Sequence, residues 1–236
     1  MQTGDVFGNA VKDYQAGEKH ARIAIFSDIS DKGYIDVNYL FRDSENMPPL
    51  EIVALHHCKG STLDIGAGAG SHSLVIQQNG LDVTAFEKSP GCCEVMKARG
   101  IRKVVNANIF DFYENKYDTL LMLMNGIGLS GDLSGYAKFL QHARKLLKKG
   151  GNIIFDTSDI IYMLDDPGSR IIDLENNRYY GTVHYWLTYK NKKSEPFPWL
   201  FLDEKTMGYI AVKSGYKVTL LAQGNHFDYL VKLTLQ

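Results

Sequence analysis

Residues 63–74, LDIGAGAGSHSL, decide the fold of this chain, because three glycines fall within five positions directly after a predicted strand. The preceding run STLDIG (61–66) has strand character, and the run SHSLVIQQNG (71–80) reads as a helix that ends at a glycine. Glycines at such a strand–helix junction let the backbone approach a ligand closely. Residues 63–74 are therefore the first candidate binding site.

Strand and helix patterns alternate on both sides of this loop. Further helices are predicted over residues 50–58, 89–100 and 134–150, and further strands over residues 81–87, 101–109, 117–126 and 151–158. The strand over 117–126 is almost entirely apolar, as expected for a strand that is buried on both faces. The alternation predicts a doubly wound, Rossmann-like α/β fold, in which helices cover both faces of a parallel sheet.

The pattern changes after Ser158. Residues 178–202 alternate between apolar and polar side chains around a polar turn, which predicts an inserted β-hairpin. A short helix (203–215) follows, and two closing strands (216–224 and 227–236) joined by a short turn are expected to be antiparallel. Residues 1–47, with a weakly helical start and a polar middle, are predicted to form an N-terminal lid or strap on the domain of residues 48–236.

Composition narrows the class of protein. The 236-residue chain has a formal net charge of −1, which gives no indication of a nucleic-acid partner. No stretch is apolar for the ~18 residues that a membrane span requires, and the N-terminus has no apolar run of a signal peptide. The three cysteines, Cys58, Cys92 and Cys93, form no metal-binding spacing. We therefore expect a cytoplasmic protein with no disulfide, no metal and no membrane partner.

The glycine spacing discriminates between ligands. A phosphate-binding P-loop requires a lysine after the glycines, and none is present. A dinucleotide fingerprint, G-x-G-x-x-G, would start at Gly66 and Gly68 and then meet Ser71, so its third glycine is missing. The pattern that fits is D-x-G-x-G-x-G, formed by Asp64, Gly66, Gly68 and Gly70.

At these four residues the chain resembles the class I S-adenosylmethionine-dependent methyltransferases, whose first motif has this form. The resemblance implies S-adenosylmethionine as cofactor and a seven-stranded, mostly parallel sheet with an antiparallel last strand. It also implies that the loop residues Asp64, Gly66, Ala67, Gly68 and Gly70 lie along the amino-acid side of the cofactor, with Asp64 organising the loop or meeting the ammonium group through water.

The resemblance implies further cofactor contacts downstream. Glu87 ends the next strand, 21 residues after Gly66, and a carboxylate there accepts both ribose hydroxyls, an arrangement that dinucleotide folds share. Lys88 follows it. The family holds the adenine with an acidic residue followed by an apolar one, whereas this chain has Asn108 and Ile109. An amide oxygen still accepts from the adenine amine, and Asp111 is the alternative for that role. The methionine moiety would meet Asn125 and Gly126.

The implied reaction is methyl transfer to a small-molecule acceptor by in-line displacement. The N/D-P-P-Y/F motif of the family's base- and glutamine-methylating members is absent from MNGIG (124–128), which disfavours those acceptors. A sulfonium is already activated as a leaving group, so alignment and exclusion of water are the enzyme's main tasks. No residue is identified as catalytic.

The acceptor is expected to meet the N-terminal segment and the hairpin. In the segment, Tyr39, Phe41 and Arg42 are candidates for a lid, with Arg42 near the cofactor carboxylate or an acidic acceptor. The alternative is a surface strap in which Phe41 fills the core. In the hairpin, His184 and Trp186 share one face and are candidate pocket residues, unless the hairpin aromatics only attach it to the sheet.

Two other functions stay open on the sequence. A nicotinamide-dependent oxidoreductase would require Ser71 to replace the third glycine of the dinucleotide fingerprint. A non-catalytic S-adenosylmethionine-binding protein would be consistent with Asn108 in place of an acidic residue.

Overall fold

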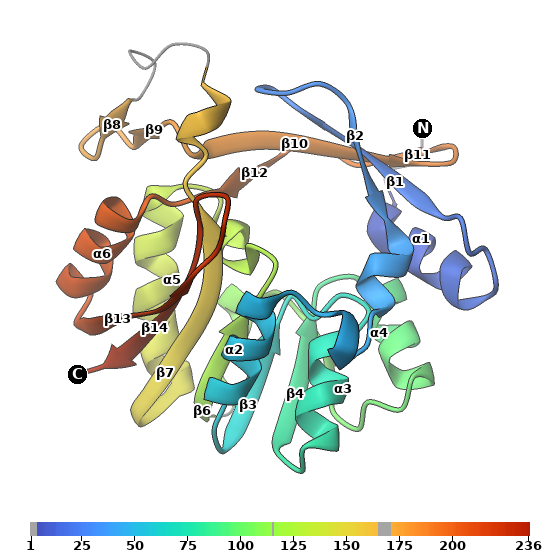
Figure 1. Cartoon of the computed structure of the whole chain (residues 1–236), viewed down its shortest axis with the longest axis horizontal. Helices are drawn as coiled ribbons and strands as arrows, with labels where there is room; N and C mark the ends of the chain where they lie inside the picture. Colours follow the sequence, from blue (N-terminus) through green and yellow to red (C-terminus); the bar gives the residue numbers. More distant parts are fainter. Residues whose placement is uncertain (1–3, 115, 165–170) are drawn as a thin grey trace. The chain divides into compact units, whose positions relative to one another are not determined.

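The main sheet of the computed structural model has seven strands in the order β13-β14-β7-β6-β3-β4-β5 (Figure 1). The structure describes residues 4–114, 116–164 and 171–236, so residues 1–3 of the predicted N-terminal segment lie outside it. β14 pairs antiparallel with β7 and with β13, whereas β4 with β5 and β6 with β7 are parallel. The prediction of a seven-stranded, mostly parallel sheet with an antiparallel last strand is confirmed.

The strands of this sheet are β3 (Ser61–Ile65), β4 (Asp82–Glu87), β5 (Val104–Asn106), β6 (Tyr117–Met122), β7 (Leu147–Ser158), β13 (Tyr216–Gln223) and β14 (Asp228–Leu235). The helices that alternate with them are α2 (Pro49–His57), α3 (Ser71–Gln78), α4 (Pro90–Ala98), α5 (Leu133–Leu146) and α6 (Glu204–Lys213). Short 3-10 turns are η1 (Val37–Phe41), η2 (Ser44–Asn46), η3 (Ile109–Asp111), η4 (Gly126–Ser130) and η5 (Ile161–Met163).

The N-terminal segment and the hairpin form a second sheet. Its strands follow the order β11-β10-β1-β2, and β12 pairs with β10. They are β1 (Arg22–Ser27), β2 (Gly33–Asp36), β10 (Thr182–Tyr189), β11 (Lys192–Lys193) and β12 (Phe197–Leu200), and helix α1 (Val6–Gln15) precedes them. A two-stranded sheet joins β8 (Ile172–Asp173) and β9 (Arg178–Tyr179). The predicted hairpin is present as β10 and β12, and the pairing of β10 with β1, which sets Phe26 opposite Trp186, was not expected.

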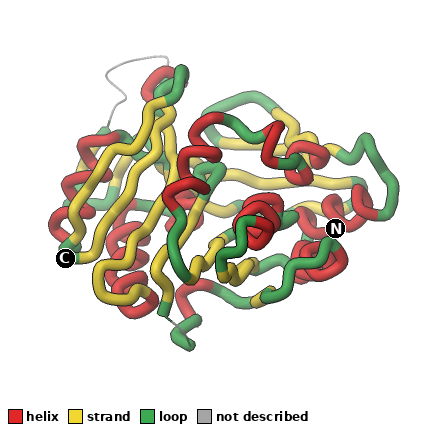
Figure 2. Tube along the Cα trace, turned by 60° about the horizontal axis from the view of Figure 1, so that its bottom comes forward, coloured by secondary structure: helices red, strands yellow, loops and turns green. Residues whose placement is uncertain are grey.

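The chain divides into two compact units. Unit 1 comprises residues 1–47, 63–112 and 184–197, and unit 2 comprises residues 48–62, 113–183 and 198–236. In unit 1, apolar residues of α1, β1 and α4 share one core, with Ala10, Val11, Ile23 and Cys92 fully buried. In unit 2, α2 lies in front of the strands in the view of Figure 1 and α5 lies behind them. β7, β14 and β13 run side by side in Figure 2.

Helix α5 ends at Leu146, four residues before the end that the sequence predicts. The basic run after it belongs to β7, where Leu147 pairs with Tyr117 across an irregular start of the strand. Leu146 at the end of α5 and Leu147 at the start of β7 are both buried. Gly150 then has a φ of 74°, so it serves a turn within β7 and does not end the helix.

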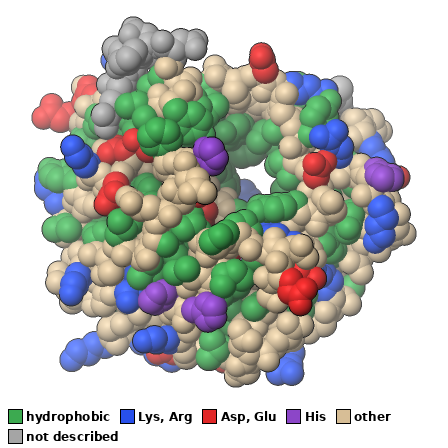
Figure 3. Space-filling view, viewed as in Figure 1, with side chains coloured by type: hydrophobic (Ala, Val, Ile, Leu, Met, Phe, Trp, Pro, Cys, Tyr) green, Lys and Arg blue, Asp and Glu red, His purple; other side chains and the backbone are tan. Residues whose placement is uncertain are grey.

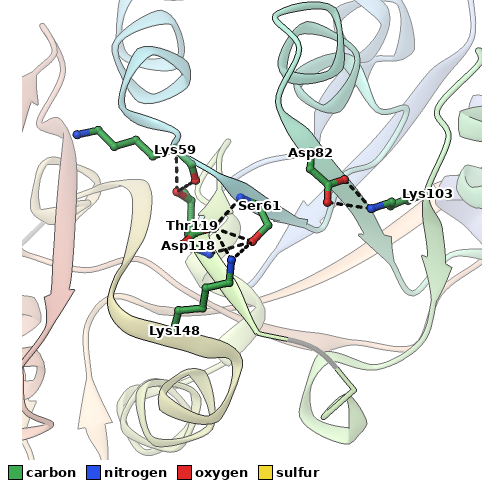
Figure 4. A network of polar contacts seen from close by, with 7 residues as sticks. All are labelled: Lys59, Ser61, Asp82, Lys103, Asp118, Thr119 and Lys148. Carbon is green, nitrogen blue, oxygen red and sulfur yellow. Dashed lines mark hydrogen bonds and ion pairs between the residues drawn. The ribbon is translucent and has the colours of Figure 1, made fainter.

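A polar network in unit 2 joins the beginnings of three strands (Figure 4). The Asp118 carboxylate accepts hydrogen bonds from the Ser61 backbone N–H and hydroxyl, each at 2.8 Å, and from Lys148 Nζ at 2.7 Å. Thr119 Oγ1 accepts from the Lys59 N–H at 3.1 Å and donates to the Lys59 carbonyl at 3.0 Å. In unit 1, Lys103 and Asp82 form a separate ion pair at 2.6 Å.

We expect the hydrogen-bonded Asp118 carboxylate to make the stability of the fold depend on pH. The hydrogen bond from Lys148, with those from Ser61, lowers the pKa of the Asp118 carboxyl from 3.8 to about 2. The interaction therefore stabilises the fold fully above about pH 4 and is lost as the pH falls toward 2. We expect Asp118→Asn to lower the urea-unfolding free energy at pH 7 by less than about 1 kcal/mol, because the group is partly exposed. The difference between variant and wild type should shrink at pH 3; a constant difference would contradict this assignment.

We expect the loss of the hydroxyl group from two buried tyrosines to have different effects on the unfolding free energy. Tyr216 Oη donates to the Leu140 carbonyl at 2.8 Å, whereas Tyr136 Oη is buried without a hydrogen-bond partner among the described residues. We expect Tyr216→Phe to lower the unfolding free energy by about 1 kcal/mol and Tyr136→Phe to leave it unchanged or raise it. Urea unfolding of the two variants in parallel tests this, and equal losses would show that Tyr136 has a partner.

Candidate functional site

The glycine loop connects β3 to α3 in unit 1. Gly66, Gly68 and Gly70 all have positive φ, at 76°, 57° and 83°, the backbone region that glycine adopts without steric cost. The Phe86 carbonyl of β4 accepts hydrogen bonds from the N–H groups of Gly66 and Ala67, at 2.8 and 3.2 Å. The loop is therefore fixed to the neighbouring strand by its backbone.

The three glycines meet different surroundings. A Cβ added at Gly66 would meet no heavy atom within 4 Å, and one at Gly68 would meet only Phe7 Cε1, at 4.0 Å. At Gly70 it would lie 2.2 Å from Ile101 Cδ1 and 2.9 Å from Met96 Cγ. The first two glycines thus leave open space beside the backbone, which fits a ligand lying against the loop, whereas Gly70 is required by packing.

Asp64 organises this loop from inside the fold. Its side chain is buried, and Oδ2 accepts a hydrogen bond from the Ser73 hydroxyl of α3 at 2.6 Å. Burial raises the pKa of the Asp64 carboxyl, while His72 and the hydrogen bonds from Ser73 act in the opposite direction. This carboxylate ties the end of β3 to the first turn of α3, which agrees with the loop-organising role among those predicted for it.

Glu87 lies at the end of β4, and backbone donors hold its carboxylate. Oε2 accepts from the Gly68 N–H at 2.9 Å, and Oε1 accepts from the N–H groups of Lys88 and Ser89 at 2.7 and 2.9 Å. Burial raises the pKa of the Glu87 carboxyl, and the three backbone hydrogen bonds lower it. The carboxylate therefore has a fixed orientation beside the glycine loop, while the Lys88 side chain is exposed.

The residues predicted for the adenine begin η3. Asn108 caps this turn, with Oδ1 accepting from the Phe110 N–H at 3.1 Å, and its side chain is exposed. Ile109 is buried and Asp111 is exposed. Because the amide oxygen of Asn108 already accepts a local hydrogen bond, its second lone pair is the one available to an adenine amine. That contact stays a prediction.

Asn125 and Gly126 lie in unit 2, where β6 runs into η4. Met124 and Asn125 have φ values of 60° and 53°, a region that residues other than glycine adopt rarely and that asparagine adopts more readily than most. The Asn125 amide accepts from Thr157 Oγ1 at 2.6 Å and donates to the Leu200 carbonyl at 3.2 Å. The Asp156 carboxylate accepts from the Asn125 N–H, with both oxygens at 3.2 Å.

Sequence reasoning missed Asp156 and Thr157. Both directly follow the buried apolar run of residues 153–155 in β7, and such polar side chains at the end of a buried run were the available signal. They hold Asn125 in its unusual conformation.

The N-terminal candidates lie in and after η1 of unit 1. Tyr39 is exposed, and Phe41 packs against the core of α1, as the strap alternative predicts for it. Arg42 is buried; its guanidinium lies 4.0 Å from the Tyr39 ring centroid and donates to the Tyr39 carbonyl. Its Nη2 lies 3.4 Å from His72 Nε2, in the first turn of α3. Arg42 therefore stands beside the helix that follows the glycine loop.

The hairpin candidates lie on β10. His184 Nδ1 pairs with Asp28 Oδ2 at 3.1 Å, and the His184 side chain is 55% exposed, so this histidine is engaged at the surface. Trp186 stacks on Phe26 of β1, with ring centroids 5.5 Å apart and planes 2° apart. Trp186 thus attaches the hairpin to the N-terminal segment, and a role of either residue in acceptor binding stays a prediction.

The described residues contain no group of three or more His, Cys, Asp or Glu placed to hold a metal ion. Cys58, Cys92 and Cys93 are free and buried, and burial raises the pKa of the Cys93 thiol to about 11. None of the helices described is long and apolar enough to cross a membrane. On the face in Figure 3, Lys and Arg side chains are scattered among acidic and apolar ones.

The chain is similar to proteins of one known family. A family model described as a methyltransferase domain matches residues 40–220. A solved S-adenosylmethionine-dependent methyltransferase from Bacteroides fragilis, in complex with S-adenosyl-L-homocysteine, is 37% identical, with a TM-score of 0.89; the match covers 98% of this chain and 94% of that chain. No curated protein matches the sequence.

Two more distant structures share the fold alone. A methyltransferase from Streptomyces caelestis is 13% identical, with a TM-score of 0.59, and covers 83% of this chain and 93% of its own. A sugar N-methyltransferase from Streptoalloteichus is 16% identical, with a TM-score of 0.56, and covers 79% of this chain and 85% of its own.

We expect alanine substitutions at Gly66 and Gly70 to lower the unfolding free energy by different amounts. Gly66→Ala introduces only backbone strain, of about 1–2 kcal/mol, because the added Cβ meets nothing. Gly70→Ala adds the clash with Ile101 and Met96, so we expect it to lower the unfolding free energy by at least about 1 kcal/mol more. Urea unfolding without cofactor measures both; equal losses would contradict the packing role of Gly70.

Proposed function

Because the chain belongs to the class I S-adenosylmethionine-dependent methyltransferases, we propose that it methylates a small-molecule acceptor by in-line displacement. The protein is an enzyme of this family, and S-adenosylmethionine is its cofactor. The site observation that carries the proposal is the open backbone at Gly66 and Gly68 beside the fixed Glu87 carboxylate. A cytoplasmic location and the absence of a nucleic-acid partner stay predictions.

Different residues of unit 1 bind different parts of the cofactor. The backbone of Gly66–Gly68 offers a flat surface, and Glu87 offers a carboxylate that accepts the two ribose hydroxyls. Asn108 and Ile109 border the adenine, and Arg42, beside His72, is a candidate partner for the cofactor carboxylate. When bound, S-adenosylmethionine supplies a methyl group on a positively charged sulfur.

The chain's own residues then need only orient the acceptor and exclude water. The constrained turn at Asn125, held by Asp156 and Thr157, supports the proposed contact of Asn125 and Gly126 with the methionine moiety. A general base is needed only for an acceptor whose proton must leave early, and no residue is assigned that role. The family assignment removes the support for both the oxidoreductase alternative and the non-catalytic alternative.

Calorimetric titration tests the cofactor site. We expect S-adenosylmethionine and S-adenosylhomocysteine to bind the wild-type protein and NAD to show no binding. Glu87→Gln should raise the Kd of S-adenosylhomocysteine at least about tenfold, because a neutral amide replaces a charged acceptor of the ribose hydroxyls. Glu175→Gln, in an exposed turn of unit 2, is the matched control and should leave the Kd unchanged.

The same preparation tests transfer. Release of S-adenosylhomocysteine from S-adenosylmethionine in the presence of a broad panel of small amines, alcohols and phenols should reveal an acceptor. Binding of the cofactor without turnover across the whole panel would contradict the proposal of a small-molecule acceptor. Binding of NAD with no response to the adenosyl compounds would overturn the proposed cofactor site.

A further inference from the structure

The carboxylate of Asp5 caps two helices at once. Oδ1 accepts a hydrogen bond from the Gly8 N–H in the first turn of α1, at 2.8 Å. Oδ2 accepts one from the Gly91 N–H in the first turn of α4, also at 2.8 Å. Helix N-termini carry unpaired N–H groups and partial positive charge, so one carboxylate placed between two of them is stabilised by both. Asp5 therefore joins α1 to the helix that follows Glu87.

Ser89 connects this carboxylate to Glu87. The Ser89 hydroxyl donates to Asp5, 2.7 Å from Oδ2, and accepts from the Cys92 N–H at 3.1 Å. Its backbone N–H donates to Glu87 Oε1 at 2.9 Å. A single residue thus receives its position from Asp5 and orients the carboxylate proposed to bind the ribose.

Close packing leaves α1 little freedom in this position. A Cβ at Gly91 would lie 2.8–2.9 Å from backbone atoms of Gly8, so the two helices touch backbone to backbone. A Cβ at Gly8 would lie 2.1 Å from Asp5 Oδ2 and 2.4 Å from Ser89 Oγ. In the same turn of α1, Phe7 Cε1 comes within 4.0 Å of the Cβ position of Gly68.

We propose that Asp5 is a positioning residue for the cofactor: through Ser89 it fixes the Glu87 carboxylate, and through α1 it places Phe7 beside the glycine loop. The inference rests on the proposed role of Glu87 in binding the ribose. It assigns the start of the N-terminal segment a role in cofactor affinity.

Two variants break the contact from opposite sides. Asp5→Asn keeps the shape but turns an amide N–H toward the Gly91 or the Gly8 donor, so one cap is lost. Gly8→Ala keeps the carboxylate and displaces it sterically. The matched controls lie in unit 2. Asp132→Asn makes the same chemical change at the cap of α5, where Oδ1 accepts from the Gly135 N–H at 2.7 Å. Gly208→Ala adds a Cβ to a helix where no atom lies within 4 Å.

Calorimetric titration with S-adenosylhomocysteine measures the effect on folded protein, checked by thermal unfolding. We expect Asp5→Asn and Gly8→Ala to raise its Kd about tenfold and both control variants to leave the Kd unchanged. If Asp132→Asn weakens binding as much as Asp5→Asn does, the effect is general destabilisation and the proposal is overturned. An unchanged Kd in the two test variants also overturns it.

Binding of an analogue without the ribose 2′-hydroxyl distinguishes an effect of Asp5 through Glu87 from a merely structural effect. If Asp5 acts through Glu87, Asp5→Asn and removal of the hydroxyl weaken the same contact. Their combined loss of binding free energy should then be smaller than the sum of the two separate losses. Full additivity would overturn the proposal. The Glu87→Gln variant distinguishes the proposed ribose contact of Glu87 from the positioning role of Asp5. If Glu87→Gln leaves the Kd of S-adenosylhomocysteine unchanged, the ribose contact itself is refuted. If Glu87→Gln raises this Kd but Asp5→Asn does not, only the positioning role is refuted.

Discussion

The carboxylate of Glu87, held by three backbone N–H groups, is the interaction on which the arrangement of unit 1 around the glycine loop depends. One of those donors belongs to the glycine loop and the other two begin the turn into α4. The arrangement requires the loop to have positive φ at its glycines and the strand to end at this residue. Because a half-buried carboxylate is stabilised by such donors, its hydrogen bonds connect the loop, the strand and the start of the helix.

Unit 2 has a comparable constraint at the end of β6. Asn125 has a left-handed backbone conformation, and it forms hydrogen bonds with Asp156, Thr157 and the Leu200 carbonyl. These hydrogen bonds fix the orientation of its amide. Both units therefore place polar groups of fixed geometry where a strand of the main sheet runs into a turn, and such rigidity favours alignment of reactants.

Much of this could be predicted from short-range patterns. The strand–glycine–helix unit, the capping of α4 by Ser89 and the closing antiparallel pair all follow from local residue types and spacing. The end of α5 could not, because helix propensity continues through the lysines after Leu146, whereas in the structure Leu147 pairs with Tyr117 of β6. The strand pairing of the N-terminal segment could not be predicted either, since β1 pairs with a strand about 160 residues away and single-sequence patterns carry no pairing information.

By itself the sequence determined the fold class, the glycine loop from Asp64 to Gly70 and the acidic residue at Glu87, because these depend on spacing along the chain. Only the tertiary structure decided what each group touches. It separated the open glycines Gly66 and Gly68 from the packed Gly70, and it attached Trp186 to Phe26. It also brought Asp5 to the start of α4, since a carboxylate 84 residues from Ser89 reaches it only after two helices have packed backbone to backbone.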